Sequence, residues 1–432
     1  MLTAEENELL TRVGPGTPMG ELFRRFWLPI FLAQELPEAD GPPIRTRILG
    51  EDLVAFRDTN GTVGIVGAFC PHRRAPLFFG RNEECGLRCV YHGWKFDASG
   101  ACVDMPSEPA ESNFKDKVSV KAYPTTELGG VVWVYMGPPD LRPSSPPRLG
   151  WTEPGLARRS AVKWFQECNW LQGVEGDIDT AHISYLHGRR PQPGDAHQAG
   201  GPPSRDGQPK LTALDTDYGM VYGGRRRTES GDFYWRVTQW MLPMYSSIPQ
   251  GPGAQTGWIP VDDHHCIRYN FGWNPDPNAA AAPPVQSFDP KIVQVPGEWG
   301  TFTFPDGGVI DTYLPAENKR NLYNRDLALM RGGHYTGIIS IPNQDRAMTE
   351  GMSYVCDRSQ EHLGTTDIAV IAARRRLLAL VRDLQNGQEP YAASHPEIFK
   401  PRALGIVSNE SDLQSLLTNH INEVQMTGLA WR

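Results

Sequence analysis

Two cysteine–histidine pairs, separated by sixteen residues, form the clearest metal-binding pattern in the sequence. Cys70-x-His72 comes first and Cys89-x-x-His92 follows. Four such ligands could hold zinc, but structural zinc loops usually pair cysteine with cysteine and histidine with histidine. Here each loop supplies one thiolate and one imidazole, and the Cys-x-His spacing is tighter than zinc loops normally use. A zinc site therefore remains an alternative, but these four ligands favour another kind of metal centre.

A two-iron, two-sulfide cluster fits this mixture of ligands better. Both loops must reach both irons, so the thiolates bind one iron and the imidazoles bind the other. Such a Rieske centre has a raised reduction potential because neutral histidine replaces cysteine at one iron. Each histidine can keep a proton on its second ring nitrogen, which allows electron and proton transfer to be coupled. Cys85 and Cys102 stand outside the pattern and are interpreted as ordinary thiols.

A second group of potential ligands follows in Asp179-x-x-His182-x-x-x-x-His187. Two imidazoles and one carboxylate on one face of an iron leave positions open for dioxygen and substrate, as in non-haem Fe(II) oxygenases. Residues five apart on a straight α-helix point about 140° away from each other. A distorted helix or a helix end must therefore bring the two histidines together. Alone, such a pair is more often structural, but the upstream cluster motif favours ligands.

At these two motifs the sequence resembles the Rieske non-haem iron ring-hydroxylating oxygenases. "CPHR" and "CVYHGWKFD" look like the Rieske signature of that family, and the Asp-x-x-His-x-x-x-x-His spacing matches its mononuclear iron motif. "LGEDLVAFRDTNG" and "DMPSEP" resemble the large (alpha) subunit of the phthalate 4,5-dioxygenase type, and this likeness covers nearly the whole chain. The resemblance implies a Rieske [2Fe-2S] cluster and a mononuclear Fe(II) that uses O2. Ala75 stands where respiratory Rieske proteins have an extra cysteine, so no disulfide between the loops is predicted.

The resemblance also implies a third iron ligand, a carboxylate far downstream with an acidic residue five positions after it. The segment "SIPNQDRAMTEGMS" fits, with Asp345 as the ligand and Glu350 five residues on. Asp311, Asp326 and Asp357 are competing candidates, and each is more typical of a surface or capping residue. The iron site is therefore predicted to consist of two histidines and Asp345.

In this family the aspartate that matches Asp179 is not a ligand. It hydrogen-bonds a Rieske histidine of the neighbouring subunit and an iron-ligand histidine of its own. We therefore expect His92 of one chain, Asp179 and His182 of the next to form an electron bridge, because the two centres of one chain would lie too far apart for fast electron transfer. A head-to-tail ring that closes gives a homotrimer, or a homohexamer of stacked trimers. Alternatively, Asp179 only stabilises a helix terminus.

The reaction implied by the resemblance is cis-dihydroxylation of an aromatic acid of the phthalate or chlorobenzoate class. Related enzymes are monooxygenases that O-demethylate methoxylated, lignin-derived aromatic acids, and the iron ligands do not discriminate between the two. A substrate carboxylate would suit an arginine fork. Arg205 and Arg236 are candidates, but no substrate-binding residue can be assigned from the sequence.

The chain has no nucleotide-binding fingerprint of its own, because "GPGTPMG" follows no strand and lacks the G-x-G-x-x-G spacing. NADH is therefore expected to act through a separate reductase carrying flavin and a [2Fe-2S] cluster, which docks an acidic or apolar surface near the Rieske centre. Two other classes of protein remain as hypotheses. One is a pure electron carrier with a large second domain, and the other is a zinc-stabilised ligand-binding protein.

Length and composition agree with a multidomain globular enzyme. The chain has 432 residues, which predicts two or three domains, and a net charge of −8, which argues against a general nucleic-acid binder. No apolar run approaches the length of a membrane span, and the acidic start "MLTAEENELL" is unlike a secretory signal. Seven cysteines in such a chain indicate cytosolic thiols, so a cytoplasmic location is expected.

The predicted fold is α+β, with an N-terminal all-β Rieske domain and a C-terminal catalytic domain in which helices pack on a curved antiparallel sheet, a helix-grip-like arrangement. Asn60-Gly61 predicts a hairpin in the first domain. Helices are expected within 1–30, over 170–187 and over 366–387, and a mobile loop over 188–210. The predicted divisions are a helical segment that packs on the catalytic domain, the Rieske domain, a linker and the catalytic domain, at residues 1–39, 40–140, 141–150 and 151–432.

Overall fold

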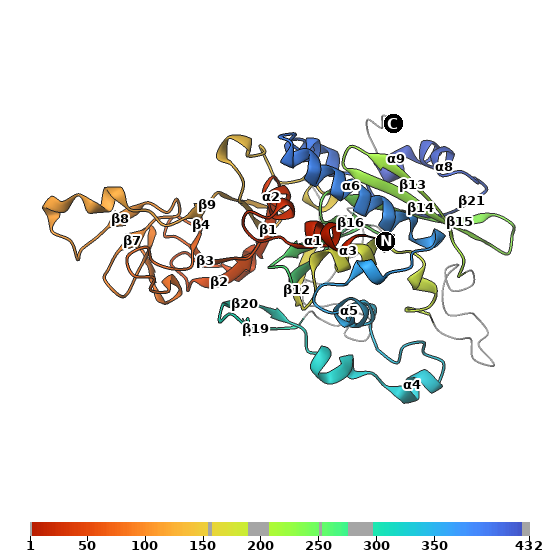
Figure 1. Cartoon of the computed structure of the whole chain (residues 1–432), viewed down its shortest axis with the longest axis horizontal. Helices are drawn as coiled ribbons and strands as arrows, with labels where there is room; N and C mark the ends of the chain where they lie inside the picture. The colour runs from red at the N-terminus through yellow and green to blue at the C-terminus, as the bar shows by residue number, and fades with distance from the viewer. Residues whose placement is uncertain (1, 154–157, 189–206, 250–252, 275–296, 426–432) are drawn as a thin grey trace.

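The computed structural model describes residues 2–153, 158–188, 207–249, 253–274 and 297–425. Figure 1 shows an elongated molecule with an all-β unit at one end and a larger unit of helices on an antiparallel sheet at the other. The two units meet where strand β2 lies beside strand β20. At this junction the guanidinium of Arg45 donates hydrogen bonds to both carboxylate oxygens of Asp311.

The chain begins with two short helices, α1 (Ala4–Thr11) and α2 (Pro18–Arg24). Thr3 and Glu6 form a capping box at the start of α1, and the Thr17 hydroxyl caps α2. The helices expected within 1–30 are therefore present. The two helices pack against the long helix α6 of the second unit, so the N-terminal segment is held on the catalytic part of the molecule.

The expected helical segment 1–39 also contains a strand, which corrects the sequence prediction. β1 (Trp27–Leu32) pairs with β11 (Val131–Tyr135), and β10 (Thr125–Leu128) completes a three-stranded sheet. All six residues of β1 are buried, which favours a strand in a core. Pro29 is tolerated because β1 is an edge strand with an irregularity directly after the proline.

The all-β unit consists of two four-stranded antiparallel sheets, ordered β2-β3-β4-β9 and β5-β6-β7-β8. The predicted hairpin joins β3 to β4, where Gly61 adopts a positive φ of 83°. The first sheet carries the second sheet and its connecting loops outward to the tip of the molecule (Figure 1). The strands are β2 (Ile44–Ile48), β3 (Glu51–Arg57), β4 (Val63–Gly67), β5 (Arg81–Glu83), β6 (Gly86–Arg88), β7 (Lys95–Phe96), β8 (Cys102–Asp104) and β9 (Ala122–Tyr123).

The larger unit is built on an eight-stranded antiparallel sheet, ordered β12-β18-β17-β16-β15-β14-β13, with β21 pairing with β15. A separate hairpin, β19 (Glu298–Thr303) and β20 (Val309–Leu314), extends toward the first unit. The main strands are β12 (Arg158–Gln166), β13 (Lys210–Thr216), β14 (Gly219–Arg227), β15 (Phe233–Met241), β16 (Tyr245–Ser247), β17 (Ala254–Pro260), β18 (Cys266–Asn274) and β21 (Leu404–Ser408).

Helices cover this sheet, so the α+β class predicted from the sequence is confirmed. α3 packs on β16 and β17 so closely that a side chain at Gly173 would lie 2.1 Å from the Trp258 ring. α6 packs against β13 and β14, and Gly387 follows its end as predicted. The helices of this unit are α3 (Trp170–Ile178), α4 (Leu327–Arg331), α5 (Ile341–Gly351), α6 (Ile368–Gln385), α7 (Tyr391–Ser394), α8 (Leu413–Asn419) and α9 (Ile421–Val424).

Among the described residues, no helix combines the length and the apolar character that crossing a bilayer requires.

Candidate metal centres

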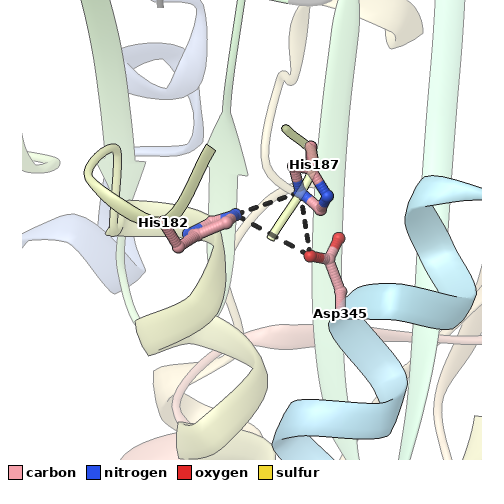
Figure 2. Close-up of side chains that lie close together, drawn as sticks. All are labelled: His182, His187 and Asp345. Carbon is pink, nitrogen blue, oxygen red and sulfur yellow. Dashed lines mark hydrogen bonds and ion pairs between the residues drawn. The ribbon is translucent and has the colours of Figure 1, made fainter. Parts of the chain in front are cut away.

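Three side chains from two distant segments converge on one point (Figure 2). The Nε2 atoms of His182 and His187 lie 3.1 Å apart, and Oδ1 of Asp345 lies 3.1 Å from Nε2 of His187 and 3.7 Å from Nε2 of His182. All three potential ligand atoms fall within 4.8 Å of one another. Two imidazoles and one carboxylate arranged in this way are the donor set of a non-haem iron site with open positions, so the residues present fit the metal that the sequence predicts.

The two histidines meet because the helix ends before them. The predicted helix 170–187 is shorter than expected: α3 stops at Ile178, Asp179 is extended (φ −90°, ψ 106°), and a single 3-10 turn, His182–Ser184, follows. The Asp179 carboxylate accepts the N–H groups of Ala181 (2.7 Å) and His182 (3.3 Å), which turns the chain. A helix end, one of the two solutions required by the five-residue spacing, is the one found.

Both imidazoles are oriented through their second ring nitrogen. Nδ1 of His187 lies 2.7 Å from Oε1 of Gln344, whose own Nε2 donates to the carbonyl of Ile338, so the amide is fixed as an acceptor. Nδ1 of His182 lies 3.4 Å from Oδ2 of Asp179. Partners of this kind set the tautomer of a metal-binding histidine, and here both leave Nε2 facing the shared point.

Burial and hydrogen bonding act in opposite directions on the carboxylates. Burial raises the pKa of Asp345, but the hydrogen bond and charge of His187 outweigh it, so this pKa is lowered overall. Burial likewise raises the pKa of Asp179, and the hydrogen bond from His182 overcomes it to give a lowered pKa. For His182, burial lowers the pKa while Asp179 raises it, and the net pKa is raised. Both carboxylates are therefore held in the ionised form.

The competing carboxylates all have other partners. Asp311 is bound by Arg45, Asp326 caps α4, and Asp357 caps a 3-10 turn. Glu350, five residues after Asp345, accepts the backbone N–H of Glu167 and the Tyr323 hydroxyl. Glu350 thus anchors α5 to its neighbours and does not join the three-ligand site.

Cys70, His72, Cys89 and His92 lie on two loops of the all-β unit that repeat one hydrogen-bonding pattern. In the first, Cys70 N–H donates to the carbonyl of Ala75 and Arg74 N–H donates to the carbonyl of Cys70. In the second loop, Cys89 and Trp94 form the equivalent pair and the N–H of residue 93 donates to Cys89. The fifth residue of each loop, 74 or 93, has a positive φ. Two matched turns therefore each present one cysteine and one histidine.

Within these loops the cysteines point inward and the histidines outward. Cys70 and Cys89 are 1% and 2% exposed and belong to the core of the unit. The rings of His72 and His92 lie 4.4 Å apart between centroids, and the His72 ring stacks on Trp94. Burial raises the pKa of the Cys70 thiol to about 11, and a bound metal cation offsets such a shift by binding the thiolate. The donor set fits a cluster with a buried thiolate side and an accessible imidazole side.

Comparison with known proteins supports both centres. The Rieske [2Fe-2S] domain family matches residues 26–124, and the LigXa C-terminal domain family matches residues 134–430. The phthalate 4,5-dioxygenase oxygenase subunit of Pseudomonas putida is 41% identical over 90% of this chain and 88% of the relative. The 3-chlorobenzoate-3,4-dioxygenase oxygenase subunit of Comamonas testosteroni is 38% identical over 93% and 94%.

The chain is a Rieske non-haem iron oxygenase component. Its relatives include the 5,5'-dehydrodivanillate O-demethylase oxygenase subunit of a Sphingobium species, 32% identical over 98% of this chain and 90% of the relative. Among solved structures, dicamba monooxygenase aligns with a TM-score of 0.55 and 18% identity over 84% of this chain and 99% of that chain, which shows a shared fold. Rieske cluster, mononuclear iron and O2 are the cofactors and co-substrate of this family, and the sequence prediction of the family is confirmed.

A cavity of about 690 Å³ opens beside the three-ligand site of this oxygenase. Asp179, His182 and Asp345 form part of its wall, and much of the remainder is apolar, with Met348 and Tyr335 among the exposed members. Five carboxylates but only two arginines line it, so the cavity is acidic overall.

Of the two substrate arginines suggested by the sequence, only Arg236 can be compared with this cavity, and it is not among the lining residues. Arg205 lies outside the described residues. Arg236 lies on β15 and donates to the carbonyl of Pro249. Next to His72 the exposed charged residues are Arg73 and Arg74, and Val90 and Tyr91 of the second loop are exposed apolar residues. The surface expected to be acidic or apolar therefore carries basic and apolar side chains at these positions, and its role in docking a reductase stays a prediction.

Sequence reasoning missed three polar residues in or next to the iron site: Gln344, Asp177 and Arg268. Gln344 directly precedes Asp345, so its position next to a predicted ligand was the available signal. Asp177 and Arg268 are brought together only by the packing of α3 on the sheet, and nothing in their spacing indicates a shared site.

Proposed function

We propose that this oxygenase component cis-dihydroxylates an aromatic acid of the phthalate or chlorobenzoate class, using O2 and electrons that come from NADH through a separate flavin and [2Fe-2S] reductase in the cytoplasm. The observation that carries the proposal is the convergence of His182, His187 and Asp345, together with relatives of 41% and 38% identity that are named for these substrates. The iron would supply open positions for dioxygen and substrate. The cluster ligands in this proposal are Cys70, His72, Cys89 and His92.

The alternative reaction is O-demethylation of a methoxylated aromatic acid. It is favoured by the O-demethylase relative, which matches 98% of this chain. The same iron ligands serve both reactions, so only the products separate them. Purified protein should contain about three irons per chain, two in the cluster and one at the mononuclear site.

Turnover of a panel of aromatic acids with NADH and a surrogate reductase tests the proposal. Phthalate, 3-chlorobenzoate and methoxybenzoates should be assayed for both diol and formaldehyde. A diol from phthalate or 3-chlorobenzoate supports dihydroxylation, whereas formaldehyde from the methoxylated acids supports demethylation. Three irons per chain with neither product from any acid would contradict the proposed substrate class.

We further propose that electrons pass between protomers of a head-to-tail homotrimer, or of stacked trimers, with Asp179 as the bridge. Within one chain, the cluster loops connect strands of the all-β unit, whereas α3 and α5 lie in the other unit (Figure 1). The surface beside the cluster is basic and apolar, with exposed Arg73, Arg74, Val90 and Tyr91. The cavity beside Asp179 is acidic and apolar, which makes it complementary to the tip of a second copy.

Charge reversal at the tip tests this arrangement. Arg73→Glu together with Arg74→Glu should make the oligomer dissociate at higher protein concentration, measured by analytical ultracentrifugation, because the variant places acids against an acidic cavity. Arg142→Glu, an exposed change in the connection between the two units, serves as the control and should assemble normally. An unchanged dissociation concentration in the tip variant would contradict docking of the tip into this cavity.

A further inference from the structure

Behind the three-ligand site, one buried guanidinium stands between two carboxylates. The Arg268 side chain extends from β18 and is 6% exposed. Its Nη1 lies 3.9 Å from Oδ2 of Asp345, and its Nη2 lies 3.6 Å from Oδ1 of Asp177. The other oxygen of Asp345, Oδ1, is the one that faces the two imidazoles. The positive charge of Arg268 therefore lies nearest the Asp345 oxygen that does not face the histidines.

Arg268 is fixed in place by contacts that do not involve Asp345. Its Nε donates to Oδ1 of Asn270 over 3.1 Å. The guanidinium carbon lies 5.2 Å from the ring centre of Trp164 and 4.9 Å from that of Trp258, a cation–π arrangement in a desolvated setting. The guanidinium is thus preorganised, and it can orient a carboxylate rather than follow it.

Asp177 is equally constrained, and its side chain is 6% exposed. Its Oδ2 accepts hydrogen bonds from the Ser246 hydroxyl (2.8 Å), the Trp258 indole N–H (2.6 Å) and the Thr256 hydroxyl. Trp258 consequently supports both members of the ion pair, donating to Asp177 while its ring faces Arg268. Asp179, only two residues further along the chain, instead contacts His182.

We infer that Arg268 is a positioning residue for Asp345 and that Asp177 is its counter-charge. This inference rests on the proposed assignment of Asp345 as an iron ligand. A buried cation close to a divalent metal site disfavours metal binding, and it also attracts the carboxylate that should bind the metal. The negative charge of Asp177 offsets the positive charge of Arg268, whose guanidinium lies between the two carboxylates. Arg268 can therefore orient Asp345 without pulling its carboxylate away from the iron.

Iron affinity of charge variants tests the pairing. Equilibrium dialysis against buffered Fe2+ measures the Kd of the mononuclear site, with the two cluster irons as internal reference. Asp177→Asn leaves Arg268 unopposed and should weaken iron binding at least about ten-fold. Adding Arg268→Met to this variant removes the excess charge and should recover most of the loss. The conservative Asp177→Glu should bind iron more tightly than Asp177→Asn.

Two comparisons make the outcome decisive. Asp177→Asn binding iron as tightly as the wild type, or Arg268→Met failing to improve it, would overturn the inference. If Asp177→Asn does not fold, the iron affinity of Arg268→Met is compared with that of the double variant. Arg268→Met should bind iron at least as tightly, because it retains one more negative charge. Weaker iron binding by Arg268→Met would also overturn the inference. A wild-type protein that binds no third iron would instead contradict the proposed ligand set.

A charge-neutral control separates pairing from local packing. Ser246→Ala removes one hydrogen bond to Asp177 but keeps its charge. Its iron affinity should stay within about two-fold of wild type, because loss of one neutral hydrogen bond is a small perturbation beside loss of a charge. A loss as large as that of Asp177→Asn would show that packing around Asp177, rather than its charge, controls iron binding, and would overturn the inference.

Discussion

The two metal centres of this oxygenase differ in how the chain assembles them. The cluster loops are short, close in sequence and built on two copies of the same turn, Cys70 to Ala75 and Cys89 to Trp94. The mononuclear site instead joins the end of α3 to α5. In the sequence, strands β13 to β20 lie between these two helices. Local turns alone position the first set of ligands, whereas the second depends on the packing of a whole domain.

This difference explains what the sequence could and could not predict. The four cluster residues were predicted from spacing, because a turn determines how neighbouring residues point. The two histidines were also predicted from spacing, and the need for a distorted helix or a helix end followed from helix geometry. Asp345 needed the resemblance to a family, because no local pattern relates it to His182. Gln344, Asp177 and Arg268 were missed because only tertiary packing brings them to the site.

The fold shows the same limit. The sequence predicted the hairpin at Asn60-Gly61, the helices α1, α2 and α6, and the helical covering of an antiparallel sheet. Strand β1 was missed because residues 1–39 were interpreted as a helical segment, although an edge strand with an irregularity accommodates Pro29. Strand order in the large sheet, where β21 joins β15 from the C-terminal region, has no signal in local periodicity.

Removing Asp345 should eliminate the mononuclear iron and leave the Rieske cluster in place. Asp345→Ala should abolish mononuclear iron and turnover while the Rieske absorption spectrum stays intact, because the cluster residues lie in the all-β unit and α5 lies in the other unit. Iron analysis and visible spectroscopy measure the two effects. Asp326→Ala, which removes only the cap of α4, is the matched control and should retain about three irons. Bound mononuclear iron in the Asp345→Ala protein would contradict its assignment as a ligand.

Asp179→Asn should slow electron transfer between the two centres while both metals stay bound. This change removes the charged partner of His182, and turnover should fall by about 10- to 100-fold. The measurement is product formed in a single turnover from the chemically reduced cluster, at full iron content. Wild-type yield and rate in this variant would show that Asp179 has no role in electron transfer.

The orientation of His187 should matter less than its presence. Gln344→Ala removes the acceptor of the His187 Nδ1 proton, and iron affinity should fall by about ten-fold. Iron binding is measured by equilibrium dialysis, and Gln414→Ala, an exposed glutamine, is the control. Equal affinities in the two variants would mean that Gln344 does not set the imidazole orientation.

The smallest effect is expected on stability rather than chemistry. Tyr323→Phe leaves a buried oxygen of Glu350 without its donor and should lower the free energy of unfolding by about 1–3 kcal/mol. Denaturant unfolding measures the change. Tyr391→Phe, at an exposed position, should be neutral. An unaltered free energy of unfolding for Tyr323→Phe would show that Glu350 does not depend on this bond to anchor α5.

The most direct test of transfer between protomers is the activity of mixed oligomers. A chain with His92→Ala, which loses the cluster, is co-assembled with a chain carrying Asp345→Ala, which loses the mononuclear iron. Neither chain has both centres, so product formation from isolated hybrids requires an electron to pass from one chain to the other. Product from hybrids, with none from either parent, is the result predicted here. Inactive hybrids that retain both kinds of metal centre would contradict the central claim.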